Sequence, residues 1–322
     1  MLLPFVFDPF LKSVLWGGSR IAMYKGWPAR SEKIGESWEL SAMPGRESVV
    51  KAGADRGLLL SQLVEKYGEA LLGRRVQALY GDRFPLIVKL IDAHRDLSLQ
   101  VHPDEALARR LHQASGKTEM WYVVQADPGA AICAGFARDL SPAEYDRHLE
   151  DRSIMSVVTR HDSHPGDAFY LPAGCIHALC AGNLVVEVQQ ASDITYRVYD
   201  YDRLDVDGRP RELHTELARE ALNFRAAADC FIPYDHASKG STPLVNGPYF
   251  RVNRVVLRGA LPIAGGRDAF VALMCVEGRV RLLKADDAVP VLSLQRGETA
   301  LLPAAAPDLV VEGEATLLQV TV

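Results

Sequence analysis

Short apolar stretches bounded by Gly and Pro recur along the chain and predict a mainly β protein, a sandwich or a barrel. Some of them alternate apolar and polar residues, as strands with one buried face do, and others are apolar throughout. The apolar N-terminal segment is interrupted by Asp8 and Lys12, so we expect a first strand there rather than a signal peptide. The other predicted strands cover residues 36–41, 85–91, 97–102, 119–125, 168–171, 184–190, 250–257 and 269–276.

Helical spacing of apolar residues is confined to a few segments. Residues 59–73 repeat at i, i+3 and i+4 and end on a glycine. Residues 103–113 predict a short helix with Pro103 in its first position, and Ser141 with Glu144 forms a capping-box pattern. Residues 211–224 predict the last helix.

Two segments share a frame of glycine, acid, apolar stretch and proline: residues 166–172 (GDAFYLP) and 297–303 (GETALLP). His177 stands five residues after the first proline, and Asp308 stands five after the second. The pattern predicts two related β units, of which only the first carries a metal. The Pro-, Gly-, Ser- and Asn-rich residues 233–249 are the predicted linker between a domain at 1–232 and a C-terminal domain at 250–322.

Composition narrows the class of protein. The 322 residues are 48% hydrophobic and 24% charged with a net charge of −5, which is typical of a soluble globular protein and offers no general attraction to nucleic acid or anionic membranes. A small anionic substrate is still compatible with a few well-placed cations. The chain has no run of eighteen apolar residues, so we expect no membrane-spanning helix. Five scattered cysteines indicate reduced thiols and a cytoplasmic protein.

Candidate chemistry begins at residues 97–102 (LSLQVH). On a strand, Ser98, Gln100 and His102 share one face, opposite three apolar residues. Glu119 opens the next apolar strand, and His177 follows a Pro-x-Gly turn ahead of another. If Ser98, Gln100 and His102 faced inward without partners, each would destabilise the fold by about 1–3 kcal/mol. We therefore expect a partner for them, and a metal with a polar substrate is one candidate.

Two histidines, a glutamate and a glutamine form a nitrogen–oxygen ligand set without thiolate. Such a set suits zinc in an open site that keeps a position for water or substrate, and iron or manganese also fit it. The alternative is that these histidines are hydrogen-bonded structural residues, as most histidines are. Spacing alone leaves both interpretations open.

The frame at residues 166–177 resembles the second motif of the cupin superfamily, with Ala181 where that motif has asparagine. More specifically, the chain resembles the short bacterial form of type I mannose-6-phosphate isomerase from about residue 4 to 225. The segments that carry the resemblance occur in the family's order: PFLKSVLWGG, KIGESWELSAMPGRESVV, FPLIVKLIDAHRDLSLQVHPDE, GKTEMWYV, YLPAGCIHAL and VEVQQASDITYRVYDYDR.

This resemblance implies cupin-type jelly-roll barrels, one metal-bearing and one degenerate, with a few short helices. It implies one Zn²⁺ per chain, held by the family's ligands at His102, Glu119 and His177. Gln100 matches a glutamine that completes the metal shell in longer relatives. The family's catalytic arginine falls on Arg197, and Ser98 and Lys89 stand where the family places polar groups around the substrate.

The implied reaction interconverts mannose 6-phosphate and fructose 6-phosphate by moving a proton between C1 and C2 through an enediol. Glu187, Lys89 and zinc-bound water are the candidate bases, and Glu187 lies between valines in an apolar strand. The alternatives are another sugar-phosphate isomerase or epimerase on the same metal site, or a non-catalytic sugar-binding cupin protein. The sequence does not indicate an oligomeric state.

Overall fold

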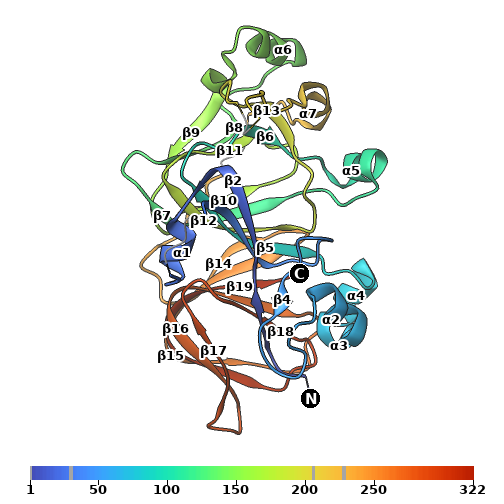
Figure 1. The fold of residues 1–322 in the computed structure, drawn as a ribbon, viewed down its shortest axis with the longest axis vertical. Coiled ribbons are helices and arrows are strands. Elements are labelled where there is room, and N and C mark those ends of the chain that lie inside the picture. Colours follow the sequence, from blue (N-terminus) through green and yellow to red (C-terminus); the bar gives the residue numbers. More distant parts are fainter. Residues whose placement is uncertain (1, 29–31, 205–206, 227–229) are drawn as a thin grey trace.

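The computed structural model describes residues 2–28, 32–204, 207–226 and 230–322. Three antiparallel sheets form its framework, and the seven helices found in these residues are short (Figure 1). The predicted mainly β class is therefore confirmed. None of the helices in the described segments is long and apolar enough to cross a membrane.

A six-stranded sheet lies in the middle of the molecule (Figure 1). Its strands are apolar on one face, and several carry polar residues at alternate positions on the other. In spatial order they are β10 (Ala168–Leu171), β7 (Glu119–Ala126), β12 (Asn183–Gln190), β5 (Leu86–Ala93), β3 (Ile34–Leu40) and β2 (Phe10–Gly18).

A five-stranded sheet faces it. Its order is β13 (Tyr196–Tyr199), β6 (Leu99–Val101), β11 (His177–Leu179), β8 (Ala131–Phe136) and β9 (Val158–Asp162). Its outer face packs against apolar side chains of three helices, α5 (Glu105–His112), α6 (Pro142–Glu150) and α7 (Thr215–Ala221), and of a 3₁₀ turn at Ile154–Val157.

An eight-stranded sheet forms the other end of the molecule (Figure 1). It joins the N-terminal β1 to a strand near the C-terminus, because β1 pairs with β18. On its other side β1 pairs with β4. Its strands are β14 (Gly240–Asn246), β15 (Arg251–Ile263), β19 (Leu309–Thr321), β16 (Val271–Lys284), β18 (Thr299–Leu302), β1 (Phe5–Asp8) and β4 (Val49–Val50), with β17 (Pro290–Gln295) paired to β16.

This pairing bears on the predicted domain boundaries. β14 lies inside the predicted linker 233–249 and pairs with β15, so the C-terminal sheet begins before residue 250. Residues 5–8, from the predicted N-terminal domain, complete that same sheet. The division into domains at 1–232 and 250–322 stays a prediction.

Apolar layers separate the sheets. One core cluster joins the inner faces of the six- and five-stranded sheets, around Trp121, Ile132 and Leu179. A larger one joins the other face of the six-stranded sheet to the C-terminal sheet and to four helices, α1 (Arg20–Tyr24), α2 (Leu60–Tyr67), α3 (Glu69–Leu72) and α4 (Arg74–Tyr80). The inner faces of the first two sheets therefore enclose the space in which the polar residues meet.

Two helix ends test the predicted local signals. Ser141 and Glu144 form the predicted capping box at the start of α6. Pro103 does not occupy the first helical position, because Asp104 caps α5 by accepting from the Leu107 N–H at 2.8 Å. The predicted helix 59–73 is divided into α2 and α3 at Gly68, whose φ is +44°.

Candidate metal centre

One row of the five-stranded sheet carries three of the predicted site residues. Gln100 in β6 lies opposite His177 in β11 on one side and opposite Arg197 in β13 on the other. His102 follows β6 directly, two residues on, so its side chain shares the face of Gln100. The predicted alternation of polar and apolar residues thus positions these groups between the two sheets.

Glu119 reaches the same place from the facing sheet, as the first residue of β7. Its Oε2 lies 3.3 Å from His102 Nε2, and its Oε1 lies 3.1 Å from His177 Nε2. All three side chains are at most 1% exposed. One possible ligand atom from each lies within 4.8 Å of the others. The structure therefore brings together the three residues predicted as metal ligands.

Backbone carbonyls orient both imidazole rings. His102 Nδ1 lies 2.9 Å from the Ile194 carbonyl oxygen, and His177 Nδ1 lies 2.9 Å from that of Cys175. A carbonyl can only accept, so each Nδ1 carries a proton, and each Nε2 points toward Glu119. This is the hydrogen-bond arrangement of histidines that bind metals through Nε2.

The protonation states also suit a metal. Burial, and next the charge of Lys117, lower the pKa of His102 to about 3, so the ring is neutral at neutral pH. Burial acts to raise the pKa of Glu119, but the charges of Lys117 and the two histidines hold it well below its usual range. The group therefore offers a neutral imidazole at His102 and a carboxylate at Glu119, with His177 Nε2 beside them.

The surroundings of Glu119 show that a cation fits. Both of its oxygens are buried and lack a well-aligned hydrogen bond from the described residues. Each lies beside the Nε2 atom of a histidine, and a neutral Nε2 lone pair that faces a carboxylate is repulsive without a positive charge nearby. Lys117 supplies one, with its Nζ 2.9 Å from Glu119 Oε2 and 3.0 Å from His102 Nε2. Two nitrogens and a carboxylate are a ligand set suited to a divalent ion such as zinc.

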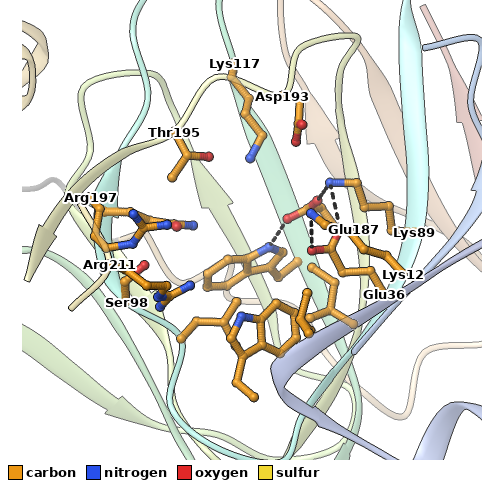
Figure 2. Close-up of a pocket in the computed structure, with 16 residues that line it drawn as sticks. Lys12, Glu36, Lys89, Ser98, Lys117, Glu187, Asp193, Thr195, Arg197 and Arg211 are labelled. Atoms are coloured by element: carbon orange, nitrogen blue, oxygen red, sulfur yellow. Dashed lines mark hydrogen bonds and ion pairs between the residues drawn. The ribbon is translucent and has the colours of Figure 1, made fainter. Parts of the chain in front are cut away.

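A cavity of about 390 Å³ adjoins this group. Gln100 and Lys117 line it on the metal side, and Gln100 Nε2 lies 3.3 Å from His177 Nε2. The cavity is also lined by the other predicted site residues and by further polar groups from the strands and loops around it (Figure 2): Lys89, Ser98, Glu187 and Arg197, with Lys12, Glu36, Asp193, Thr195 and Arg211. Its size is in the range of small-molecule sites.

The wall formed by the six-stranded sheet is a row of cross-strand partners. Glu187 in β12 lies opposite Lys89 in β5 and opposite Trp121 in β7, while Lys89 lies opposite Trp38 in β3. Glu187 accepts from Lys89 Nζ at 2.9 Å and from Trp121 Nε1 at 2.8 Å. Lys89 also donates to Gln189 Oε1 at 2.6 Å. We call these four residues of the row (Trp121, Glu187, Lys89 and Trp38) the paired wall.

The positive charges on this side of the cavity are matched by carboxylates. Burial would lower the pKa of Lys89, but Glu187 and Glu36 overcome that effect and raise it. Lys89 is therefore an ammonium group at neutral pH. Lys12 donates to Glu36 Oε1 at 3.0 Å, so the two lysines stand against two carboxylates.

Sequence reasoning did not single out Lys117, Glu36 or Arg211. A signal existed for Lys117, because residues 117 and 119 are two apart at the start of a strand and share a face. Glu36 lies two residues from Trp38, whose Nε1 donates to it at 2.7 Å. No periodicity points to Arg211, which enters the cavity from the loop that precedes α7.

Both the sequence and the fold are similar to those of known proteins. A family model described as phosphomannose isomerase type I, catalytic domain, matches residues 5–125. A second, described as mannose-6-phosphate isomerase, cupin domain, matches residues 241–322. The mannose-6-phosphate isomerase ManA of Bacillus subtilis (strain 168) is 34% identical over 97% of this chain and 96% of its own length.

Solved structures agree with these matches. The crystal structure of the mannose 6-phosphate isomerase from Bacillus subtilis has a TM-score of 0.89 at 36% identity and covers 100% of both chains. A crystal structure of mannose 6-phosphate isomerase bound with zinc and yttrium has a TM-score of 0.77 at 17% identity, which shows a shared fold.

Proposed function

This chain belongs to the type I mannose-6-phosphate isomerase family, and from that premise we propose that it interconverts mannose 6-phosphate and fructose 6-phosphate with one Zn²⁺ bound. The observation that carries the proposal is the buried group of His102, Glu119 and His177 on the wall of a polar cavity. The two Nε2 atoms face a carboxylate whose buried oxygens lack a well-aligned hydrogen bond from the described residues.

His102, Glu119 and His177 would hold the metal. Gln100, opposite His177 and lining the cavity, is the candidate for a further ligand or for a contact to the substrate. A relative with this fold is described as bound with zinc, which supports zinc over iron or manganese. When bound, the ion supplies a Lewis acid for the oxygens on C1 and C2 and for the charge that develops on them.

The chain's own residues bind and orient the substrate and move the proton. The reaction transfers a proton between C1 and C2 through an enediol, so it needs a base within reach of both carbons. We assign that role to Glu187, whose side chain lines the cavity on the paired wall. Lys89 and Trp121 orient its two oxygens by donating one hydrogen bond to each.

Lys89 itself is unsuited to remove a proton, since its raised pKa keeps it charged. It acts as a fixed positive charge beside Glu187 and stabilises negative charge that develops nearby. Ser98 and Arg197 contribute donors from the opposite wall. Lys117, in contact with both His102 and Glu119, is placed to donate to a substrate oxygen next to the metal.

The first test measures zinc content and mannose 6-phosphate isomerisation before and after complete chelation, followed by restoration with Zn²⁺. We expect activity to disappear and return with the metal. His177→Ala should lose both metal and turnover while the far-ultraviolet circular dichroism is kept. His164→Ala is the control, because its side chain is 75% exposed and outside the site.

Two outcomes would overturn the proposal. Turnover that survives complete removal of the metal would exclude the metal-dependent mechanism. A preference for another hexose phosphate in the same coupled assay would exclude mannose 6-phosphate as the main substrate. For the base, Glu187→Gln should abolish exchange of the substrate C2 proton with solvent while zinc stays bound, and near-normal exchange would exclude Glu187.

A further inference from the structure

The two walls of the cavity differ in their balance of charge. On the paired wall and beside it, Lys12 and Lys89 stand against Glu36 and Glu187. Across the cavity, Arg197 and Arg211 lie together on the side of Ser98 and Thr195 (Figure 2). The arginine side has no comparable set of carboxylates among the described residues that line the cavity.

A single carboxylate organises this side. Asp200 accepts from Arg211 through both oxygens, with Arg211 Nε at 2.7 Å from its Oδ2, and it also accepts from Arg203 Nη2 at 2.5 Å. Its side chain is 5% exposed. Asp200 thus binds the Nε and Nη2 groups of the Arg211 guanidinium. The third nitrogen, Nη1, lies on the side of the guanidinium that Asp200 does not contact.

Arg197 adds a second guanidinium with unused donors. Its Nη1 donates to the Glu212 carbonyl oxygen at 2.6 Å, while its Nε is buried and makes no hydrogen bond in the described structure. The Glu212 carboxylate does not neutralise it closely, because that side chain is 83% exposed and lies toward His214 Nε2. Burial and then the charge of Arg211 lower the pKa of Arg197, as is expected for two cations on the same side of the cavity.

Three guanidinium groups, those of Arg197, Arg203 and Arg211, lie around the one carboxylate of Asp200. Counted over these described residues, two positive charges are in surplus. A surplus of this size beside a cavity is unfavourable unless an anion joins it. A phosphate monoester near neutral pH carries about −1.5 to −2 charges and several acceptor oxygens, which matches both the charge and the forked donors.

We propose that Arg211, oriented by Asp200 and acting with Arg197, binds the phosphate group of the substrate. The proposal rests on the proposed function and adds the direction in which the substrate lies. The phosphate end lies at Arg197 and Arg211, and the C1–C2 end lies toward Gln100 and Lys117, which line the same cavity next to the metal group. Lys89, which was predicted among the polar groups around the substrate, is hydrogen-bonded to Glu187 and Gln189 on the paired wall.

The test uses the zinc-loaded protein and a hexitol 6-phosphate, which carries the phosphate but lacks the carbonyl that isomerisation needs. Calorimetric titration compares wild type with Arg211→Met, Arg211→Lys and Arg258→Met. Arg258 is exposed on β15 in the C-terminal sheet and serves as a charge-matched control. Arg211→Met still leaves Asp200 paired with Arg203, so the carboxylate keeps a partner.

We expect Arg211→Met to raise the dissociation constant of the hexitol 6-phosphate by about 10- to 100-fold, as for loss of a charged hydrogen-bonded pair. Arg211→Lys should recover part of this loss because it restores the charge without the fork. With mannose 6-phosphate, KM should rise much more than kcat falls, while zinc content stays unchanged. Arg258→Met should behave as wild type in every assay.

The outcomes separate this proposal from the proposed function. Wild-type protein that binds the hexitol 6-phosphate through Arg211 but turns over no mannose 6-phosphate would retain the phosphate site and exclude the isomerase assignment. Wild-type protein that isomerises mannose 6-phosphate while Arg211→Met binds the hexitol 6-phosphate within twofold of wild type would overturn the phosphate site. A fall in kcat at constant KM would also contradict it.

Discussion

Replacing Lys89 by methionine tests whether the paired wall is held by charge. Lys89 is 4% exposed and is held by Glu187 at 2.9 Å and Gln189 at 2.6 Å, with Glu36 at 3.9 Å. Methionine fills much of the same volume but leaves Glu187 with only the Trp121 hydrogen bond among the described contacts. A buried carboxylate that loses its partner charge is destabilising by about 3–5 kcal/mol.

That range corresponds to a decrease of about 10²- to 10⁴-fold in the folding equilibrium constant. In the double variant Lys89→Met/Glu187→Gln the isolated charge is gone, and a glutamine oxygen can still accept from Trp121 Nε1. We therefore expect the double variant to be more stable than Lys89→Met alone. Lys12→Met is the control: its side chain is 32% exposed, so its ion pair with Glu36 should contribute less than about 1 kcal/mol.

The assay is urea unfolding followed by tryptophan fluorescence, with chelator present in every sample so that metal binding does not contribute to stability. Trp38 and Trp121 both contact this wall and report on it directly. A Lys89→Met protein within about 1 kcal/mol of wild type would refute the reasoning. So would a double variant whose loss equals the sum of the two single losses, since the two charges would then be uncoupled.

Three further predictions concern stability elsewhere. In metal-free protein, the free energy of unfolding should decrease as pH falls from 6.5 toward about 3. In this range His102 binds a proton in the unfolded chain but not in the folded one, because its pKa is lowered to about 3 on folding. His102→Gln should flatten this pH dependence in urea titrations. Lys25→Met should lower stability by about 3–5 kcal/mol in the same urea assay, since Lys25 holds the buried Glu39 at 2.7 Å and reaches the C-terminal sheet at the Gly297 carbonyl. Gly73→Ala should cost about 1–3 kcal/mol by thermal unfolding, because φ is +89° and a Cβ would lie 2.3 Å from the Asp268 carbonyl oxygen; Gly45→Ala, also at positive φ but in open space, should cost less.

Local patterning was sufficient for much of the fold. The strand predicted at 168–171 is β10 with the same ends, and the strands predicted at 85–91 and 184–190 are β5 and β12 within two residues at each end. β15 runs on to Ile263 through Gly259 and Pro262, two residues that argue against a strand. Pairing with β19 along its whole length outweighs these local preferences, and such pairing is not visible in one segment alone.

Strand ends and period-two spacing marked His102, Glu119 and His177 as candidates, and the family resemblance is what predicted them as a ligand set. His102 directly follows β6, Glu119 and His177 open β7 and β11, and the two facing sheets bring these ends together. The charge distribution of the cavity was not predictable in this way. Arg211 contacts Asp200 eleven positions away in the sequence, so no helix or strand periodicity signals the contact.

The same contrast explains how a protein with net charge −5 can attract an anion. At physiological ionic strength the Debye length is about 8 Å, so exposed charges beyond that distance act weakly inside the cavity. Groups within contact distance therefore decide the local field. On the paired wall and beside it they cancel, with Lys12 and Lys89 against two carboxylates, whereas around Asp200 the guanidinium groups are in excess. A dianion is consequently drawn to one end of the cavity only, which leaves the opposite end of a hexose phosphate to face the metal group.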